Sequence, residues 1–288
     1  MRAAVLFILL TTTAIAAPAS AQVPAMAENQ PYSSYSYVDL ARLGEAAPIV
    51  ADVQVRDAIR LKGADAAGVP PGKARFYIVA DMLTLVRGAQ GLPGQVSFLA
   101  DLPLDPANHP PKLKKARFLA LATPVAGKPG ELRLVAPNAL IAWTPEIDRR
   151  LRAILLALAA PDAPPRITGV GKAFHVPGSL PGESETQIFL HTADNRPVSL
   201  NILRRPGEQP RWAVALGEMV DEAARPPARD TLLWYRLACF LPHDLPDEAT
   251  ADLSPADAEA SRADYAMVIT ALGPCSRQFG GIGDDGQP

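Results

Sequence analysis

Side chains that could carry catalysis are few and far apart in this sequence. The four histidines are isolated: His109 and His243 fall in loops beside prolines, whereas His175 and His191 fall in two neighbouring predicted strands. A zinc site needs spacings such as His-x-His or His-Glu-x-x-His, and neither occurs. If the two strands form a hairpin, the imidazoles of His175 and His191 lie several residues apart along it. We therefore predict no metal site and no cofactor.

Motifs for covalent catalysis and for phosphate binding are missing as well. Residues 178–182 (GSLPG) only partly follow the Gly-x-Ser-x-Gly pattern of a nucleophile elbow. Residues 169–172 (GVGK) lack the glycine spacing of a phosphate loop and the Ser or Thr that follows it. Charged residues do gather at the predicted turns after residue 180, where they are either solvated or part of an unfamiliar site. The candidates for such a catalytic site are His175, His191, Glu185 and Asp221.

The N-terminus has the three parts of an export signal. Arg2 precedes an apolar run over residues 3–15, which is too short to span a bilayer. The sequence Ala19-Ser20-Ala21 then gives the small-x-small pattern that signal peptidase cleaves. We expect a signal peptide over residues 1–21, a mature chain from Gln22, and a periplasmic or secreted protein with no transmembrane segment.

Charge and composition narrow the class of partner. The chain has 28 basic and 30 acidic residues, and its formal net charge is −2. One short basic cluster, residues 112–117 (KLKKAR), is too small to predict a nucleic-acid partner. The 30 prolines fall mostly between apolar runs, which is typical of many short elements separated by turns.

A first domain is predicted over residues 48–160. Asp57 interrupts the alternation of the first strand and indicates a bulge, whereas residues 75–86 are apolar on both faces and indicate a central strand. Gly127–Gly130 predicts a hairpin turn, and Thr144 is the expected N-cap of a closing helix. Short links between strands favour a small antiparallel, OB-like barrel. Its predicted strands are residues 49–61, 75–86, 96–102, 117–122 and 131–135.

Three segments of this domain resemble a known family. They are residues 49–63 (IVADVQVRDAIRLKG), 76–98 (FYIVADMLTLVRGAQGLPGQVSF) and 116–125 (ARFLALATPV). Their order resembles the netrin-like module of tissue inhibitors of metalloproteinases and its distant secreted bacterial relatives, which implies an OB-type barrel with a packed helix. In the inhibitors an N-terminal cysteine binds the zinc of the target. Because the predicted mature end here is Gln22 and the module has no cysteine, the resemblance implies a fold and no functional residue.

A second domain is predicted over residues 166–279, after a proline-rich linker at 161–165. Four strands separated by turn signals predict an antiparallel meander, and two helices follow it, so the predicted fold class is α+β. The strands are residues 167–176, 185–192, 197–203 and 211–216; the helices span 230–241, with Asp230 as N-cap, and 254–272, with Ser254 as N-cap. We expect an extended arm over residues 22–47 and a flexible tail over 280–288.

The only two cysteines, Cys239 and Cys275, fall in the first of these helices and just past the second. An even number of cysteines in an oxidising compartment favours a disulfide, and two buried free thiols are the alternative.

Three functions agree with these observations. Since no catalytic motif is present, we favour a non-catalytic exported envelope protein that binds another protein or an envelope polymer through the barrel face or the domain cleft. The second is a hydrolase or transferase with an unfamiliar site in the second domain. The third is a structural role in an envelope assembly, which an exposed apolar patch would signal.

Overall fold

The structure is a computed structural model of the chain, and it describes residues 35–88, 91–217 and 225–279. The predicted signal peptide, the predicted tail over residues 280–288 and the candidate Asp221 lie outside the described residues. The predicted α+β fold class is confirmed, because a closed β-barrel is followed by a separate four-stranded antiparallel sheet and by helices.

The barrel closes through five strands in the order β1-β2-β3-β5-β4, with β4 pairing back onto β1. A partly buried ion pair supports this closure: Arg117 of β4, whose side chain is 37% exposed, donates to both carboxylate oxygens of the buried Asp52 in β1, at 2.8 and 2.6 Å. A sixth short strand, β6, which the sequence analysis missed, extends the sheet from β4. The strands are β1 (Ile49–Arg60), β2 (Lys73–Arg87), β3 (Gln95–Pro103), β4 (Arg117–Pro124), β5 (Glu131–Leu134) and β6 (Leu140–Ala142).

Two details of the predicted barrel are wrong. The barrel is not wholly antiparallel, because β3 and β5 run parallel. A closed ring with an odd number of strands cannot alternate direction at every pairing, so one parallel pair is unavoidable. Strand β2 is central as predicted, between β1 and β3, but the apolar residues of its outer face are not all buried: Phe76 and Ile78 point into the barrel, while Tyr77 is 37% exposed on the outside. The bulge expected at Asp57 is confirmed by a register shift between Val55 and Asp57.

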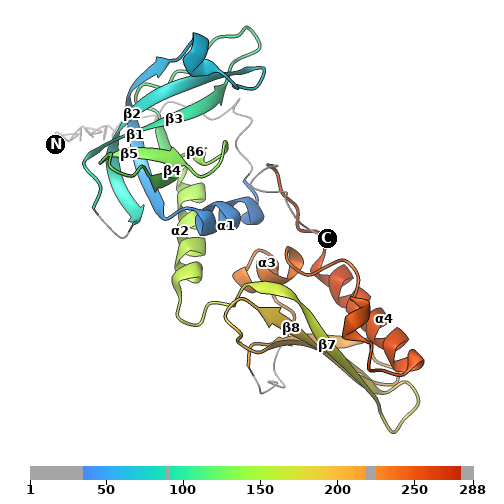
Figure 1. Ribbon diagram of the computed structural model, residues 1–288. Helices are drawn as coiled ribbons and strands as arrows, with labels where there is room; N and C mark the ends of the chain where they lie inside the picture. The colour runs from blue at the N-terminus through green and yellow to red at the C-terminus, as the bar shows by residue number, and fades with distance from the viewer. Residues whose placement is uncertain (1–34, 89–90, 218–224, 280–288) are drawn as a thin grey trace, which may run out of the picture. The chain divides into compact units, whose positions relative to one another are not determined.

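Helix α2 (Pro145–Ala159) begins as predicted, with Thr144 accepting a hydrogen bond from the Ile147 backbone N–H. The extended arm predicted over residues 22–47 is wrong at its C-terminal end, where helix α1 (Tyr37–Ala46) lies against α2 (Figure 1). A capping box between Ser36 and Asp39 starts α1.

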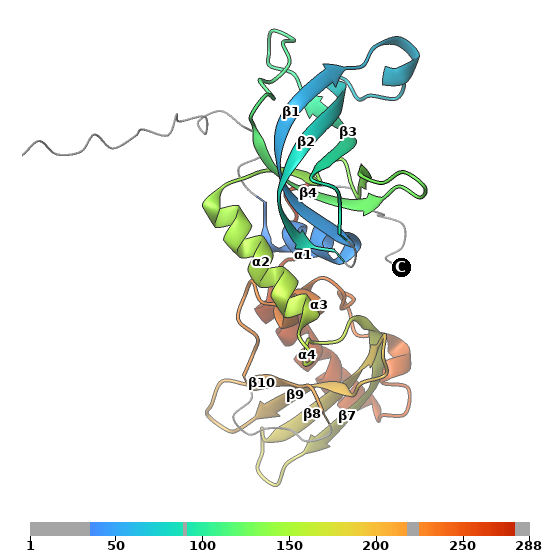
Figure 2. The same ribbon diagram turned by 90° about the vertical axis from the view of Figure 1, so that its left-hand side faces the viewer.

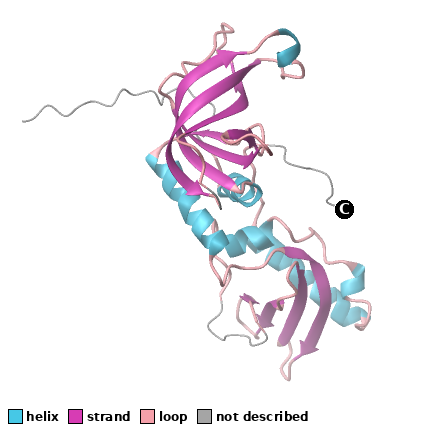
Figure 3. Ribbon diagram, turned by 60° about the vertical axis from the view of Figure 1, so that its left-hand side comes forward, coloured by secondary structure: helices cyan, strands magenta, loops and turns pink. Residues whose placement is uncertain are grey.

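The second sheet is the predicted meander, with the order β10-β9-β8-β7. Helix α4 (Pro255–Leu272) lies along one face of this sheet (Figure 3). The predicted N-cap of α4, Ser254, is confirmed, and Gly273 caps its C-terminal end. Helix α3 (Leu232–Ala238) is shorter than predicted and is capped by Thr231, because Asp230 has a φ of +59°. The strands are β7 (Ile167–Pro177), β8 (Ser184–Thr192), β9 (Val198–Arg204) and β10 (Arg211–Ala215).

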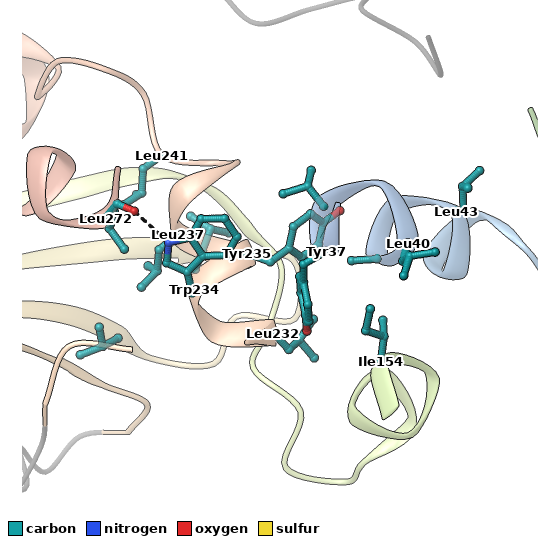
Figure 4. Packing of buried hydrophobic residues seen from close by; sticks show 14 of the residues in the cluster. Tyr37, Leu40, Leu43, Ile154, Leu232, Trp234, Tyr235, Leu237, Leu241 and Leu272 are labelled. Atoms are coloured by element: carbon teal, nitrogen blue, oxygen red, sulfur yellow. Dashed lines mark hydrogen bonds between the residues drawn. The ribbon is translucent and has the colours of Figure 1, made fainter. Parts of the chain in front are cut away.

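One buried cluster contains residues from both sides of the predicted linker (Figure 4). Leu40 of α1, Ile154 of α2 and Leu232 of α3 belong to it. At its edge, Glu45 of α1 accepts hydrogen bonds from the Tyr235 hydroxyl, at 2.9 Å, and from the nearly buried Arg236. Burial, and then the Glu45 carboxylate, raise the pKa of Tyr235 above its usual range, so its hydroxyl stays a donor at neutral pH.

The predicted disulfide is confirmed, with the Cα atoms of Cys239 and Cys275 5.1 Å apart. It joins the end of α3 to the segment that follows α4. In the described ranges, no helix is both long enough and apolar enough to cross a membrane.

Replacing both cysteines by serine, C239S/C275S, is expected to lower the free energy of unfolding by about 3 to 4 kcal/mol, because the unfolded chain is no longer restrained by the loop that the bond closes. Urea denaturation of wild type, with and without reductant, and of the variant measures the effect. In protein taken from its native host, both thiols should resist iodoacetamide until reductant is added. Rapid alkylation without reductant would argue against an oxidising compartment.

Candidate functional site

The structure separates the candidate catalytic residues of the sequence analysis. His175 of β7 lies opposite Thr186 of β8, whereas His191 lies opposite Gly169. Because Thr186 and His191 are an odd number of residues apart on one strand, His191 projects from the opposite face of the sheet. Glu185 shares that opposite face and is exposed. The predicted combination of a histidine with Glu185 is therefore not assembled around His175.

The other two histidines lie in exposed loops. His109 Nδ1 lies 3.2 Å from Asp105 Oδ2, and His243 Nδ1 lies 3.1 Å from Oδ1 of its neighbour Asp244. Across the part of the chain that the structure describes, no three metal-ligating side chains gather at one place.

His175 instead joins a polar cluster with residues that the sequence analysis did not select. Its Nδ1 lies 2.8 Å from Thr186 Oγ1, and the Thr186 hydroxyl donates to Asp264 of α4. Arg204 of β9 donates from Nε to the other oxygen of Asp264 at 2.6 Å. Thr186 and Asp264 are fully buried, while His175 and Arg204 are partly exposed. We call these four residues the His175 cluster.

Proton accounting fixes the tautomer of the neutral His175 ring. Thr186 has one hydroxyl proton, which goes to the Asp264 carboxylate, an acceptor that has no proton of its own to give. The Nδ1 of His175 must therefore donate to Thr186, which leaves Nε2 with a free lone pair in the neutral ring. The cluster can hold a base in one tautomer, and it also anchors α4 to the sheet.

A sequence signal for this cluster does exist. Asp264 falls on the helix face that also carries Ser261, Tyr265, Val268 and Leu272, all of which are buried. A carboxylate on a buried helix face requires hydrogen-bond donors from whatever the helix covers. The identity of these donors depends on strand register, which the sequence does not reveal.

A second surface lies on the outside of the barrel, where β1, β2 and β3 run side by side (Figure 2). Ile59, Tyr77 and Leu99 lie directly opposite one another on these strands. Their exposed fractions are 55, 37 and 49%, respectively. We call these three residues the apolar row.

A hollow of about 480 Å³ adjoins the apolar row at the β1–β2 connection, which includes the short 3₁₀ helix η1 (Gly63–Ala66). Arg75 lines the hollow from the same outer face of β2 as Tyr77, and Asp101 holds its guanidinium through two hydrogen bonds of 2.8 and 2.9 Å. We call this feature the cationic hollow. Its lining residues are Arg60, Leu61, Lys62, Gly63, Ala66, Val69, Lys73, Ala74 and Arg75.

Comparison with known proteins returned no matching family model and no matching curated protein. The resemblance to netrin-like modules therefore stays a prediction.

Substituting Thr186→Val is expected to lower the free energy of unfolding by about 1 to 3 kcal/mol, because valine keeps the shape of threonine but leaves a carboxylate oxygen of the buried Asp264 without its hydroxyl donor. Urea denaturation measures this loss, and ¹⁵N NMR of the imidazole should show that the Nδ1–H tautomer is no longer enforced. Thr84→Val, at an exposed strand position, is the matched control and should change stability by less than about 0.5 kcal/mol. Equal stability of the two variants would contradict the hydrogen-bond chain.

Proposed function

We propose that this protein is exported and binds another protein through the outer face of its barrel, without catalysing a reaction. The observation that carries the proposal is the apolar row. Single exposed apolar residues are ordinary on a protein surface, but here three lie in register across three neighbouring strands. OB-type barrels commonly use the face of their second and third strands and the loop after the first as a binding surface, for oligonucleotides and oligosaccharides among other ligands.

The composition of the row favours a protein partner over an envelope polymer. Tyrosine is enriched at the energetic centre of protein interfaces, where it supplies a large rigid surface and a polar hydroxyl. Ile59 and Leu99 flank Tyr77 with branched aliphatic side chains, which complement apolar side chains of a partner. A surface that binds a sugar polymer would be expected to present several flat aromatic rings, on which sugar rings can stack.

Export is the second part of the proposal. It is supported by the predicted signal peptide over residues 1–21 and by the Cys239–Cys275 disulfide, since such bonds persist mainly in oxidising compartments. The envelope or the extracellular space is then the place where the partner is met.

A photo-crosslinking amino acid at position 77 tests the binding proposal in the native host. Irradiation is expected to give a discrete adduct with one protein, and Leu99→Ala should reduce the yield at least tenfold, because it removes a neighbouring part of the contact. The same crosslinker at Leu156 of α2, which is 73% exposed, is the control and should give no such adduct. The same adducts from both positions, or no protein adduct from position 77, would count against the proposal.

A second candidate function is hydrolysis or group transfer at His175, which the fixed tautomer and the free Nε2 favour. Arg204 beside Asp264 could hold an anionic substrate. If His175 is a general base, hydrolysis of small 4-nitrophenyl esters should fall about 10²-fold or more in His175→Ala. His109→Ala, at an exposed histidine, should leave the rate unchanged. Equal rates for His175→Ala and wild type would remove this candidate.

A further inference from the structure

We propose that the cationic hollow binds carboxylates of the partner, so that the protein recognises an acidic segment. This inference rests on the proposed function, because the hollow adjoins the apolar row. Its own evidence is the charge and the construction of the hollow.

Unpaired positive charge is the first argument. Arg60, Lys62 and Lys73 line the hollow, and none of them forms an ion pair with any residue in the described ranges. The charge of Arg75 is neutralised by its ion pair with Asp101. The loop that lines the hollow also carries the exposed carboxylate of Asp65, which offsets part of the remaining positive charge. In a chain whose formal net charge is −2, a local excess of cations around one concave surface favours an anionic ligand.

Preorganisation of the loop is the second argument. While Asp101 holds its guanidinium, Arg75 also donates to the backbone carbonyl oxygens of Ala67, at 3.2 Å, and Asp65, at 3.5 Å. Backbone hydrogen bonds hold both ends of the loop: the Leu61 N–H donates to the backbone carbonyl of Arg75, and the Leu104 N–H donates to the backbone carbonyl of Gly72, each at 2.9 Å. A loop held in this way loses little conformational entropy when a ligand binds. Arg75 is thus a positioning residue for the hollow.

The lining indicates the chemistry of the anion. Leu61, Ala66, Val69 and Ala74 give the hollow apolar walls beside its cations. A glutamate side chain fits such a surface, because its methylene groups can contact the walls while its carboxylate reaches the ammonium and guanidinium groups. Inorganic phosphate has no apolar part to use these walls.

Spacing along the strand links the hollow to the apolar row. Arg75 and Tyr77 are two residues apart on one face of β2, which is about 7 Å at the usual rise of a strand. An extended partner segment would cover this distance with two residues. The recognised segment should therefore carry apolar and acidic side chains about two to four residues apart.

A direct test uses a labelled ten-residue peptide with a Leu-Val-Leu run followed by three glutamates, and a matched peptide with glutamine in place of glutamate. Fluorescence anisotropy with the folded mature chain should give at least tenfold tighter binding of the acidic peptide at low salt. The charge-reversal variant K62E/K73E should abolish this difference and flatten the salt dependence. K112E/K114E has the same net charge but alters exposed lysines outside the hollow, so it should stay within twofold of wild type.

The outcomes separate this inference from the function on which it rests. If Y77A weakens binding while K62E/K73E behaves like K112E/K114E, the acidic specificity is wrong and docking on the row stands. If neither Y77A nor K62E/K73E matters, both fail. If inorganic phosphate or a polyuronate competes through Lys62 and Lys73 while the acidic peptide does not, a different anion occupies the hollow and the inference is overturned. Circular dichroism of each variant verifies that the fold is intact.

Discussion

The buried contact between Glu45 and Arg236 is the constraint on which the arrangement of the described elements depends. Arg236 is 5% exposed, and a buried guanidinium without its carboxylate costs several kcal/mol. Glu45 stands in the last turn of α1, so this pairing holds the C-terminal end of α1 against α3. The backbone N–H groups of Gln278 and Phe279 donate to Asp39 in the first turn of α1, so the segment after the disulfide is tied to the same helix. Helix α1, which lies in the segment predicted to be an extended arm, thus contacts both α3 and the segment after the disulfide.

Barrel closure has consequences for the surface as well as for the core. Because β4 pairs back onto β1, beside the Asp52–Arg117 ion pair, the alternating side chains of each strand point into the barrel or out of it. The outward positions of β1, β2 and β3 then come into register at Ile59, Tyr77 and Leu99. Arg75, two residues before Tyr77 on the same face of β2, donates to a backbone carbonyl of the β1–β2 loop and lines the cationic hollow. The apolar row and the cationic hollow therefore both depend on the pairing of β2 with its two neighbours and on the β1–β2 connection.

Local chemistry explains how far the sequence could predict this structure. The caps Thr144 and Ser254, the bulge at Asp57 and the cysteine pair all depend on near neighbours or on compartment, and these predictions are confirmed. Helix α1 was missed because its capping box sits in a polar, tyrosine-rich segment and its burial depends on distant partners. The His175 cluster needs Thr186 and Asp264, which are 78 residues apart, to meet. The apolar row likewise needs the register of three strands, which alternation alone does not set.

The two candidate sites differ in what their side chains are already doing. In the His175 cluster, the Asp264 carboxylate and the Thr186 hydroxyl are buried and fully engaged, and together they hold α4 on the sheet. Only Nε2 of His175 and the outer part of Arg204 remain for a ligand. On the barrel, Tyr77 and its neighbours are exposed, and Arg60, Lys62 and Lys73 stand without a described ion-pair partner. Binding free energy comes from groups that exchange water for a partner, and the barrel surface offers more of them than the cluster does.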